Sequence, residues 1–291
     1  MTSEQLMHEV LLSISVSAEY AKKSVLRKLT FQIKRGEILG LVGQSGCGKS
    51  TLALAVLRLL HLKGGKSFGT LQLNGLDLMS MSERQMRGIR GKEISLVLQS
   101  PLSSLNPVLR IGTQLAEAWH AHRRGNRQEC RNALLESLAN VSLPPEEEFL
   151  RRYPAQLSVG QAQRVLIAMS VLHRPMLLIA DEPTSALDVI TQAEVLGLFR
   201  NLSRQMGVAI LYITHDLLSV STIADRIAVM HQGEIVECRE ARAIFTDPQH
   251  AYTRDLIAAL PCVPAFPATK ELYSTAIKSH AAEPSSFVAP S

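Results

Sequence analysis

A glycine-rich segment of eight residues places the strongest constraint on how this chain of 291 residues can fold. An apolar run at 38–42 precedes it and a helix-like run at 51–60 follows it. A strand, a glycine-rich turn and a helix in this order are typical of a loop that wraps polyphosphates, because glycines let backbone N–H groups point at anionic oxygens. The helix adds the positive end of its dipole. The phosphate-binding residues predicted here are Gly43, Gln44, Ser45, Gly46, Cys47, Gly48, Lys49, Ser50 and Thr51.

Side chains of this segment also have individual roles. Lys49 supplies a mobile cation for the outer phosphates, and the Ser50 hydroxyl is placed to hold Mg²⁺. Cys47 lies near a helix N-terminus, which is expected to lower its pKa. The segment therefore predicts a polyphosphate group, as in a nucleotide, as ligand, together with Mg²⁺.

A second apolar run, at 176–180, ends in the two acids Asp181 and Glu182. A carboxylate at the C-terminal end of a parallel strand reaches the crevice where ligands bind in open α/β sheets. We expect Asp181 to hold Mg²⁺, through water, since this ion keeps much of its hydration. Glu182 is expected to orient or deprotonate the attacking water.

The order of the remaining elements predicts an α/β fold with a mainly parallel sheet and crossover helices. We expect strands at 10–16, 29–33, 37–42, 70–73, 94–98, 176–180 and 208–213, a hairpin at 226–238 and a loop at 63–69. Helices are expected at 51–60, 111–121, 127–141 and 161–172, and one more is closed by Gly207. The helical block interrupts the sheet, and the last 25 or so residues are expected to form a poorly ordered tail.

Composition excludes several classes of function. The net charge is +5 with scattered Lys and Arg, and aromatic residues make up 4%, so no nucleic-acid partner is expected. The four cysteines include no C-x-x-C pair, which disfavours a zinc or redox site and favours a reducing cytoplasm. No apolar run is long enough to span a membrane, and no secretory signal is expected.

Several motifs in order resemble those of the ATP-binding cassette (ABC) ATPases. Leu157 to Gln161 is similar to the signature motif, and Asp181 to Asp188 is similar to the Walker B segment and D-loop. Gln99 and His215 match the Q-loop glutamine and the switch histidine. The resemblance covers about residues 10–260. It implies a P-loop NTPase (RecA-like) core, a small antiparallel β subdomain and an inserted helical subdomain, divided as 1–99 (first part of the core, with the β subdomain), 100–172 (helical), 173–240 (second part of the core) and 241–291 (C-terminal extension).

The same resemblance implies the roles of further residues. Two chains would hold two ATP molecules head to tail, so that Ser158, Gly160 and Gln161 bind the nucleotide of the opposite subunit and Asp188 crosses the interface. Gln99 would bind Mg²⁺ or the water, and His215 the γ-phosphate. Tyr20, 29 residues before Lys49, would stack on adenine. The predicted catalytic residues are Glu182, His215, Gln99 and Lys49, and the metal ligands are Ser50, Gln99 and Asp181.

One position departs from the family pattern, because Val159 stands where members usually have glycine. A β-branched residue adds bulk beside the expected phosphate. We expect its Cβ to point away from that phosphate and activity to persist.

Residues 99–107 and 250–254 resemble importers of peptides, dipeptides and nickel. This implies an ATPase on the cytoplasmic face of the cell membrane, with a second identical or related ATPase, two permeases and an external binding protein as partners. A soluble ABC ATPase of DNA repair is disfavoured because only 57 residues separate Gln99 from Leu157, too few for a long coiled coil. A translation type is disfavoured by the single cassette, and a GTPase or kinase by the missing N-K-x-D segment. An exporter ATPase stays open, as does the solute.

Overall fold

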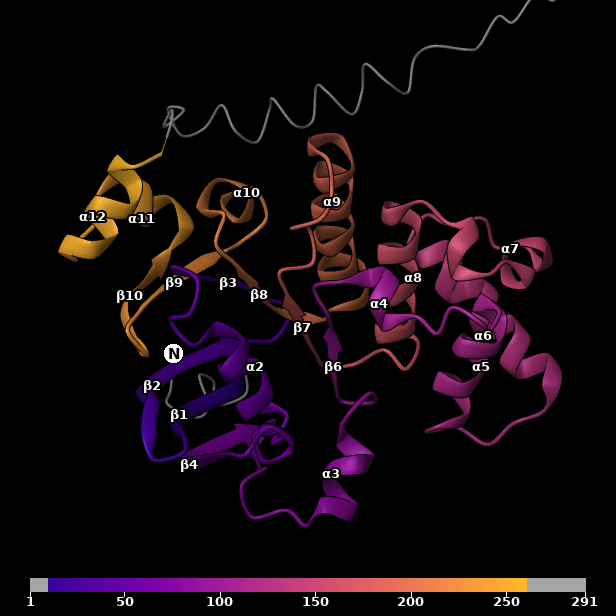
Figure 1. Cartoon of the computed structure of the whole chain (residues 1–291), viewed down its shortest axis with the longest axis horizontal. Coiled ribbons are helices and arrows are strands. Elements are labelled where there is room, and N and C mark those ends of the chain that lie inside the picture. Colours follow the sequence, from indigo (N-terminus) through magenta and orange to yellow (C-terminus); the bar gives the residue numbers. More distant parts are fainter. Residues whose placement is uncertain (1–9, 261–291) are drawn as a thin grey trace, which may run out of the picture.

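Two β-sheets and a group of helices make up residues 10–260, the part of the chain that this computed structural model describes (Figure 1). The smaller sheet, sheet A, has the strand order β2-β1-β4-β5. The larger sheet, sheet B, has the order β10-β9-β3-β8-β7-β6. The predicted fold class is confirmed, since sheet B is parallel except for β10 and sheet A is antiparallel. The expected tail beyond residue 260 lies outside the described residues.

Sheet A consists of β1 (Val10–Tyr20), β2 (Lys23–Lys34), β4 (Gly65–Leu73) and β5 (Leu76–Asp77). In β1 buried and less buried residues alternate, as expected for a strand with one face on the core. The prediction of a loop at 63–69 was wrong, because β4 already begins at Gly65. Gly69 lies inside this strand at φ +118°, where an added Cβ would come 2.1 Å from the Ser15 carbonyl oxygen. This glycine therefore allows a close strand approach and does not mark a loop.

Sheet B consists of β3 (Ile38–Val42), β6 (Ile94–Val97), β7 (Leu177–Asp181), β8 (Ala209–Thr214), β9 (Arg226–His231) and β10 (Glu234–Glu240). Every residue of β3 and β8 is buried, because both faces of a central parallel strand are covered. Strands β9 and β10 form the predicted hairpin around residues 231–233. The five parallel strands all end at one edge of the sheet, and that edge carries the candidate site.

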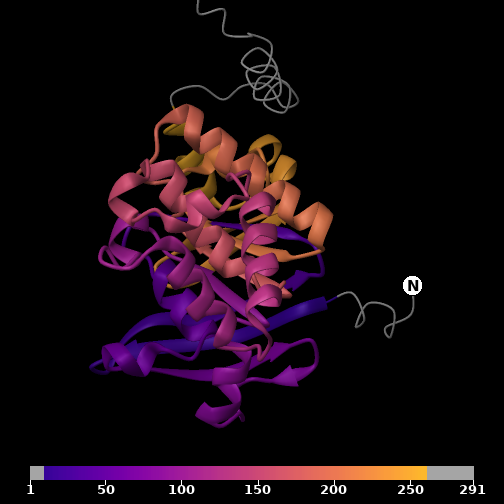
Figure 2. The ribbon, with the colours of Figure 1, turned by 90° about the vertical axis from the view of Figure 1, so that its right-hand side faces the viewer.

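Helices cover both sides of sheet B. Between β3 and β6 lie α2 (Lys49–Val56), the 3₁₀ turn η1 (Leu60–Lys63) and α3 (Glu83–Ile89). Between β6 and β7 lie α4 (Pro101–Ser104), α5 (Ile111–His120), α6 (Arg127–Asn140), α7 (Glu147–Arg151), the 3₁₀ turn η2 (Pro154–Gln156) and α8 (Val159–Val171). After β7 come α9 (Val189–Met206), α10 (Leu217–Ser221), α11 (Ala241–Thr246) and α12 (Ala251–Ala258). The helices from α4 to α8 gather apart from sheet A in both views (Figure 1, Figure 2). This helical lobe matches the block expected between the strands at 94–98 and 176–180.

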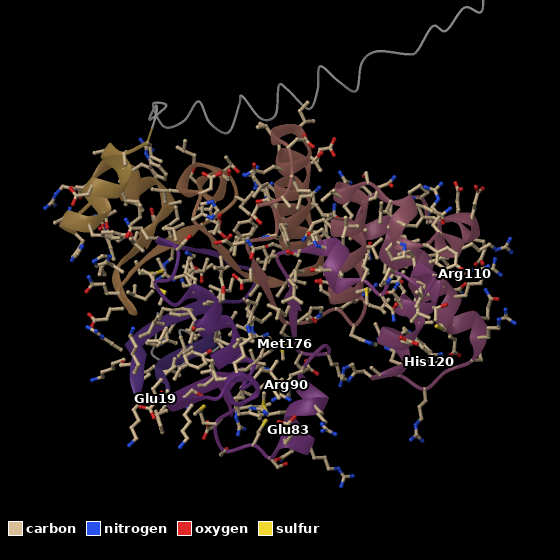
Figure 3. The ribbon with its side chains drawn as sticks, in the orientation of Figure 1. Glu19, Glu83, Arg90, Arg110, His120 and Met176 are labelled. Atoms are coloured by element: carbon tan, nitrogen blue, oxygen red, sulfur yellow. The ribbon has the colours of Figure 1, made fainter. Side chains whose placement is uncertain are left out.

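Among the differences between the observed and the expected helices, three concern α2, α8 and α3. The helix expected to reach residue 60 ends at Val56, since Arg58 adopts a positive φ of 52°. Helix α8 begins at Val159, two residues before the expected start. Helix α3 was not predicted; Arg90, just after it, pairs with Glu83 through both of its terminal nitrogens and donates to the Leu57 carbonyl oxygen (Figure 3). That contact fastens α3 to the end of the α2 segment.

Sheet B separates two hydrophobic clusters. Alternate residues point to opposite faces, so that Leu178 and Ile210 pack with α9 and the helical lobe, whereas Ile179 and Leu211 pack with sheet A and α2. Sheet B is thus packed on both faces, which fixes the position of its C-terminal edge. Within residues 10–260, none of the helices has the length and apolar character needed to cross a bilayer.

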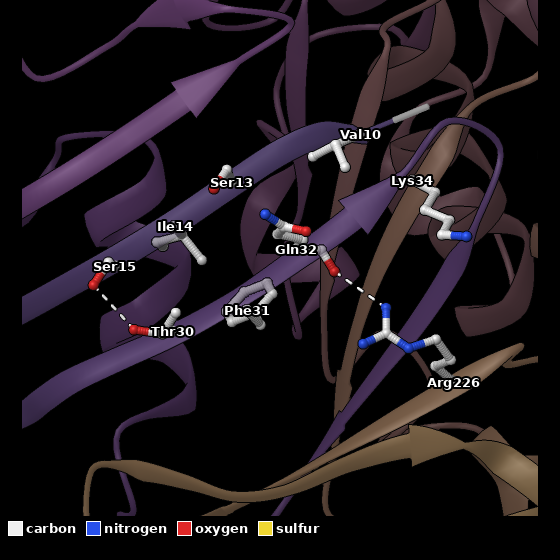
Figure 4. Close-up of a pocket in the computed structure, with 9 residues that line it drawn as sticks. All are labelled: Val10, Ser13, Ile14, Ser15, Thr30, Phe31, Gln32, Lys34 and Arg226. Carbon is white, nitrogen blue, oxygen red and sulfur yellow. Dashed lines mark hydrogen bonds between the residues drawn. The ribbon is translucent and has the colours of Figure 1, made fainter. Parts of the chain in front are cut away.

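A groove with a volume of about 460 Å³ lies where sheet A meets β9 (Figure 4). Arg226 lines it and donates hydrogen bonds to the Gln32 carbonyl oxygen at 3.3 Å and to Glu37 Oε1 at 3.0 Å. Arg226 therefore links the two sheets beside the groove.

Candidate nucleotide-binding site

The C-terminal edge of sheet B brings distant residues together. Because β3, β8, β7 and β6 are neighbours in that order, the segments that follow them emerge side by side. These segments are the glycine-rich loop after Val42, His215 after β8, the pair Asp181 and Glu182 at the end of β7, and Gln99 shortly after β6. Topology alone thus gathers the predicted catalytic residues at the point where ligands bind in such sheets.

The glycine-rich loop joins β3 directly to α2. Gly48 has φ +113°, a conformation that favours glycine, and precedes the helix. Gly43 packs so closely on β9 that an added Cβ would come 2.3 Å from the Met230 carbonyl oxygen. Lys49 is only 6% exposed, and its Nζ donates to the carbonyl oxygens of Gly43 at 2.7 Å and Gln44 at 3.1 Å. The ammonium group is therefore held inside the loop that it is predicted to serve.

A cavity of about 330 Å³ opens above this loop. Residues of the loop and residues that follow the strands both line it. Predicted phosphate-binding residues and predicted catalytic residues therefore face the same cavity. The lining residues are Val25, Ser45, Gly46, Gly48, Lys49, Ser50, Thr51, Gln99 and Glu182.

Asp181 and Ser50 form a pair suited to Mg²⁺. Burial raises the pKa of Asp181, and a hydrogen bond from the Ser50 side chain opposes that rise. Asp181 Oδ1 is buried and has no hydrogen-bond partner within the described residues. A buried, unpartnered carboxylate oxygen beside a hydroxyl is a donor set that a hard divalent cation satisfies. These two residues therefore fit the metal site predicted from the sequence.

Contacts of its backbone and of both carboxylate oxygens fix the orientation of Glu182. Its backbone adopts φ +47°, an unusual value for a residue with a side chain, and its N–H donates to the Ile213 carbonyl oxygen at 2.9 Å. Its Oε2 accepts from Gln99 Nε2 at 3.0 Å, and its Oε1 lies 3.2 Å from His215 Nδ1. The carboxylate is thus oriented by two of the other predicted catalytic residues.

The signature segment and the D-loop lie together at the N-terminal ends of α8 and α9. Ser158 caps α8 and forms a capping box with Gln161. Asp188 caps α9, and hydrogen bonds from the backbone and hydroxyl of Thr191 lower its pKa. A Cβ on Gly160 would come 2.5 Å from Thr191 Cγ2, so the two helix ends pack closely here. None of these residues lines the cavity above the phosphate loop.

Val159 is 38% exposed at the first turn of α8, whereas its neighbour Gly160 faces α9. The partial exposure of Val159 explains why a side chain larger than that of glycine is accommodated at position 159, since the fold does not enclose it there. That its Cβ points away from a bound phosphate stays a prediction.

Three residues near the loop add to the comparison with the sequence analysis: Cys47, Tyr20 and Val25. Burial raises the pKa of Cys47 more than Lys49 lowers it, so the expected lowering was wrong. Tyr20 does not line the cavity; it lies against Gly65, where a Cβ would come 2.6 Å from the ring. Val25 of β2 lines the cavity but was not predicted, because no sequence signal reports which end of a strand faces a loop. Adenine stacking by Tyr20 stays a prediction.

Comparison with known proteins finds one matching family and several similar chains. The sequence model of the family described as ABC transporter matches residues 26–185. The glutathione import ATP-binding protein GsiA of Escherichia coli (strain K12) is 44% identical over 256 residues. That alignment covers 86% of this chain and 41% of the relative. GsiA of Pectobacterium atrosepticum is 43% identical over 258 residues, covering 87% of this chain and 41% of the relative. The chain thus spans about two fifths of the length of these relatives.

Solved structures agree on the fold. CbiO1 from Clostridium perfringens, described as part of the ABC transporter complex cbiONQ, superposes with a TM-score of 0.72 at 24% identity. That superposition covers 87% of this chain and 96% of that one. The ATP-binding cassette MJ0796, described as a dimer bound to ADP and Pi, superposes with a TM-score of 0.67 at 27% identity, covering 80% of this chain and 99% of that one.

Proposed function

This chain belongs to the ABC transporter family, and from that premise we propose that it is the ATP-binding and ATP-hydrolysing subunit of an import system. One observation carries the proposal. The loop around Lys49, with Ser50, lines one cavity at the C-terminal edge of sheet B together with Gln99 and Glu182. Beside that cavity, Asp181 contacts Ser50 and His215 contacts Glu182. Phosphoryl transfer needs positioning and charge stabilisation more than covalent chemistry from the protein, and this set of groups supplies both.

The proposed reaction is attack of water on the γ-phosphorus, with ADP as leaving group and inorganic phosphate as product. Glu182 accepts the proton that the water loses as the new P–O bond forms. Gln99 and His215 keep the carboxylate aimed, and the exposed imidazole of His215 is free to donate to the γ-phosphate. Lys49 moves its ammonium contact from the loop carbonyls to the outer phosphates.

Asp181 and Ser50 are the residues that would hold Mg²⁺, with Gln99 as the third predicted ligand. The ion, when bound, neutralises charge that develops on the phosphate oxygens. The raised pKa of Asp181 is consistent with this role, because a buried carboxylate gains most when a cation compensates its charge.

A second ATPase subunit is part of the proposal. Val189 and Ile190 are 72% and 62% exposed at the start of α9, directly beside Asp188. Two adjacent exposed apolar side chains form a small apolar patch, and such a patch favours contact with a partner. We propose that the partner is a second cassette, identical or related, whose ATP contacts Ser158, Gly160 and Gln161.

Membrane permeases are the other proposed partners. In the lobe of residues 100–172, the apolar side chains of Leu102 and Val108 are 48% and 75% exposed, and both follow Gln99 closely in the chain. A contact at this place would link permease motion to the glutamine that touches Glu182. The chain would then sit at the cytoplasmic face of the cell membrane, and an external binding protein would deliver the solute.

Small peptides are the favoured solute class. The relatives are named for import of glutathione, a small peptide, and residues 99–107 and 250–254 resemble importers of peptides and nickel. The relatives' names favour import over export and over a soluble role in repair or translation. Nickel stays the second candidate.

The proposed function is tested by copurification and turnover. We expect the chain to copurify with two permeases and to hydrolyse ATP, and Lys49→Ala to abolish nucleotide binding. Uptake of labelled glutathione or dipeptides should depend on the chain, whereas uptake of labelled nickel should not. A preparation that stays monomeric and turns over at full rate would contradict the two-cassette arrangement.

A further inference from the structure

Helix α12 contacts the phosphate loop, although the sequence separates them by about two hundred residues. The backbone N–H of Gln44 donates to the hydroxyl of Tyr252 at 3.3 Å. Tyr252 lies in the first turn of α12, beyond residues 26–185 that match the family model. Helices α11 and α12 lie beside β9 and β10 at the end of sheet B (Figure 1). The contact therefore joins an element outside the nucleotide core to the loop that the core uses for phosphate.

Helix α12 is held in place by a buried carboxylate. Glu237 of β10 is 7% exposed and accepts hydrogen bonds from the N–H groups of Gln249 and His250, each at 3.0 Å. Burial raises the pKa of Glu237, but these backbone hydrogen bonds outweigh it, and the pKa is lowered overall. His250 Nδ1 in turn accepts from the N–H of Tyr252 at 3.2 Å. The first turn of the helix is thus fixed before Tyr252 reaches the loop.

The aromatic ring of Tyr252 is fixed as well. It packs on the imidazole ring of His231, with ring centroids 4.0 Å apart and planes tilted by 31°. His231 ends β9 directly after Met230, whose carbonyl oxygen packs against Gly43. Tyr252 and β9 therefore contact the start of the loop together.

Gln44 is held on both sides of its backbone. Its carbonyl oxygen accepts from Lys49 Nζ at 3.1 Å, and its N–H donates to Tyr252. A movement of this residue would shift one of the two carbonyl groups that hold the Lys49 ammonium. The residue that binds the outer phosphates is therefore connected through Gln44 to α12.

We propose that Tyr252 is a positioning residue for the phosphate loop, and that the C-terminal extension tunes nucleotide affinity through it. The inference rests on the proposed function, since it assumes that the loop binds ATP. Tyr252 does not line the cavity, so it acts through Gln44 and not on the nucleotide itself. Loss of one neutral hydrogen bond corresponds to an effect of about 2- to 10-fold on the equilibrium that it biases.

The test compares ATP affinity in the full chain and in Tyr252→Phe, which keeps the ring on His231 and removes only the hydroxyl. We expect the Kd for ATP and the KM of ATP hydrolysis to rise about 2- to 10-fold, with kcat unchanged and Tm lowered by a few degrees at most. Tyr153→Phe is the matched control, because Tyr153 lies in the helical lobe, away from the phosphate loop, and its hydroxyl accepts from Arg110 Nε at 3.4 Å. It should bind ATP as the wild type does.

The outcomes separate the inference from the proposed function. Wild-type affinity in Tyr252→Phe would overturn the positioning role while leaving the ATPase proposal intact. A lower Tm together with wild-type ATP affinity, measured below the unfolding temperature, would assign Tyr252 a structural role only. That outcome would also overturn the positioning role. A wild-type chain that binds no ATP would refute the proposed function, and the inference with it.

Discussion

Replacing Glu182 by glutamine isolates the proposed chemical step from nucleotide binding. Both carboxylate oxygens have partners, Gln99 Nε2 at 3.0 Å and His215 Nδ1 at 3.2 Å, so a side chain of the same shape should keep its place. Glutamine cannot accept the proton that water loses. A positioned base contributes about 10²–10⁴-fold to the rate, which corresponds to a barrier increase of about 2.7–5.4 kcal/mol. We therefore expect kcat to fall by that factor in Glu182→Gln.

Nucleotide binding should survive the same change. In the proposed site, Lys49 and the loop N–H groups hold the phosphates, and neither depends on the charge of Glu182. Release of inorganic phosphate gives kcat, and titration with ATP gives Kd. Glu147→Gln is a suitable control, because it removes a carboxylate from an exposed ion pair with Arg131 on the helical lobe and should change neither value. Hydrolysis at the wild-type rate in Glu182→Gln would refute the role of Glu182 as base.

Three further predictions concern the surroundings of the site. Gly160→Ala should destabilise the fold by about 1 kcal/mol, since overpacking against Thr191 at 2.5 Å outweighs the gain in helix propensity. Val159→Gly should create no such clash. Thermal unfolding of both variants tests this, and an unchanged Tm for Gly160→Ala would contradict the packing argument. Glu237→Gln should cost about 1–3 kcal/mol at pH 7, because two N–H groups lose a charged acceptor. The lowered pKa of Glu237 contributes stability that is present above the ordinary carboxyl pKa of 4.5 and is lost as the pH falls below that value. The free energy of unfolding should therefore differ more between pH 7 and pH 4 for the wild type than for Glu237→Gln. Equal losses of stability in the two proteins would argue against this linkage. Cys47 should react slowly with thiol reagents at neutral pH, because burial raises its pKa, and bound ATP should slow the reaction further; labelling that ATP leaves unchanged would place this thiol away from the nucleotide.

Local patterns predicted most of the nucleotide core. The loop around Lys49 and the strand that ends at Asp181 were predicted because each motif is contiguous and its neighbours have a clear periodicity. The same holds for the hairpin at 226–238 and for the helical block. Boundaries were less certain: β4 begins at Gly65 and α2 ends at Val56, since Gly69 and Arg58 take conformations that tertiary packing selects.

Contacts between distant segments could not be predicted in this way. Val25 lines the cavity because sheet A packs beside the loop, and Tyr252 reaches Gln44 because the buried Glu237 fixes α12. The direction of the Cys47 pKa shift also depends on the surrounding burial, which a helix-terminus argument does not contain.

The amino-acid sequence alone determined that this chain carries a phosphate loop and two acids at the end of a buried strand, because these features depend on residue type and spacing over short distances. Only the tertiary structure decided that Glu182 contacts both Gln99 and His215, and that Tyr252 of α12 accepts a hydrogen bond from Gln44 in the loop. The physical reason is that strand order and close packing set which distant backbones become neighbours, and no local pattern encodes that order.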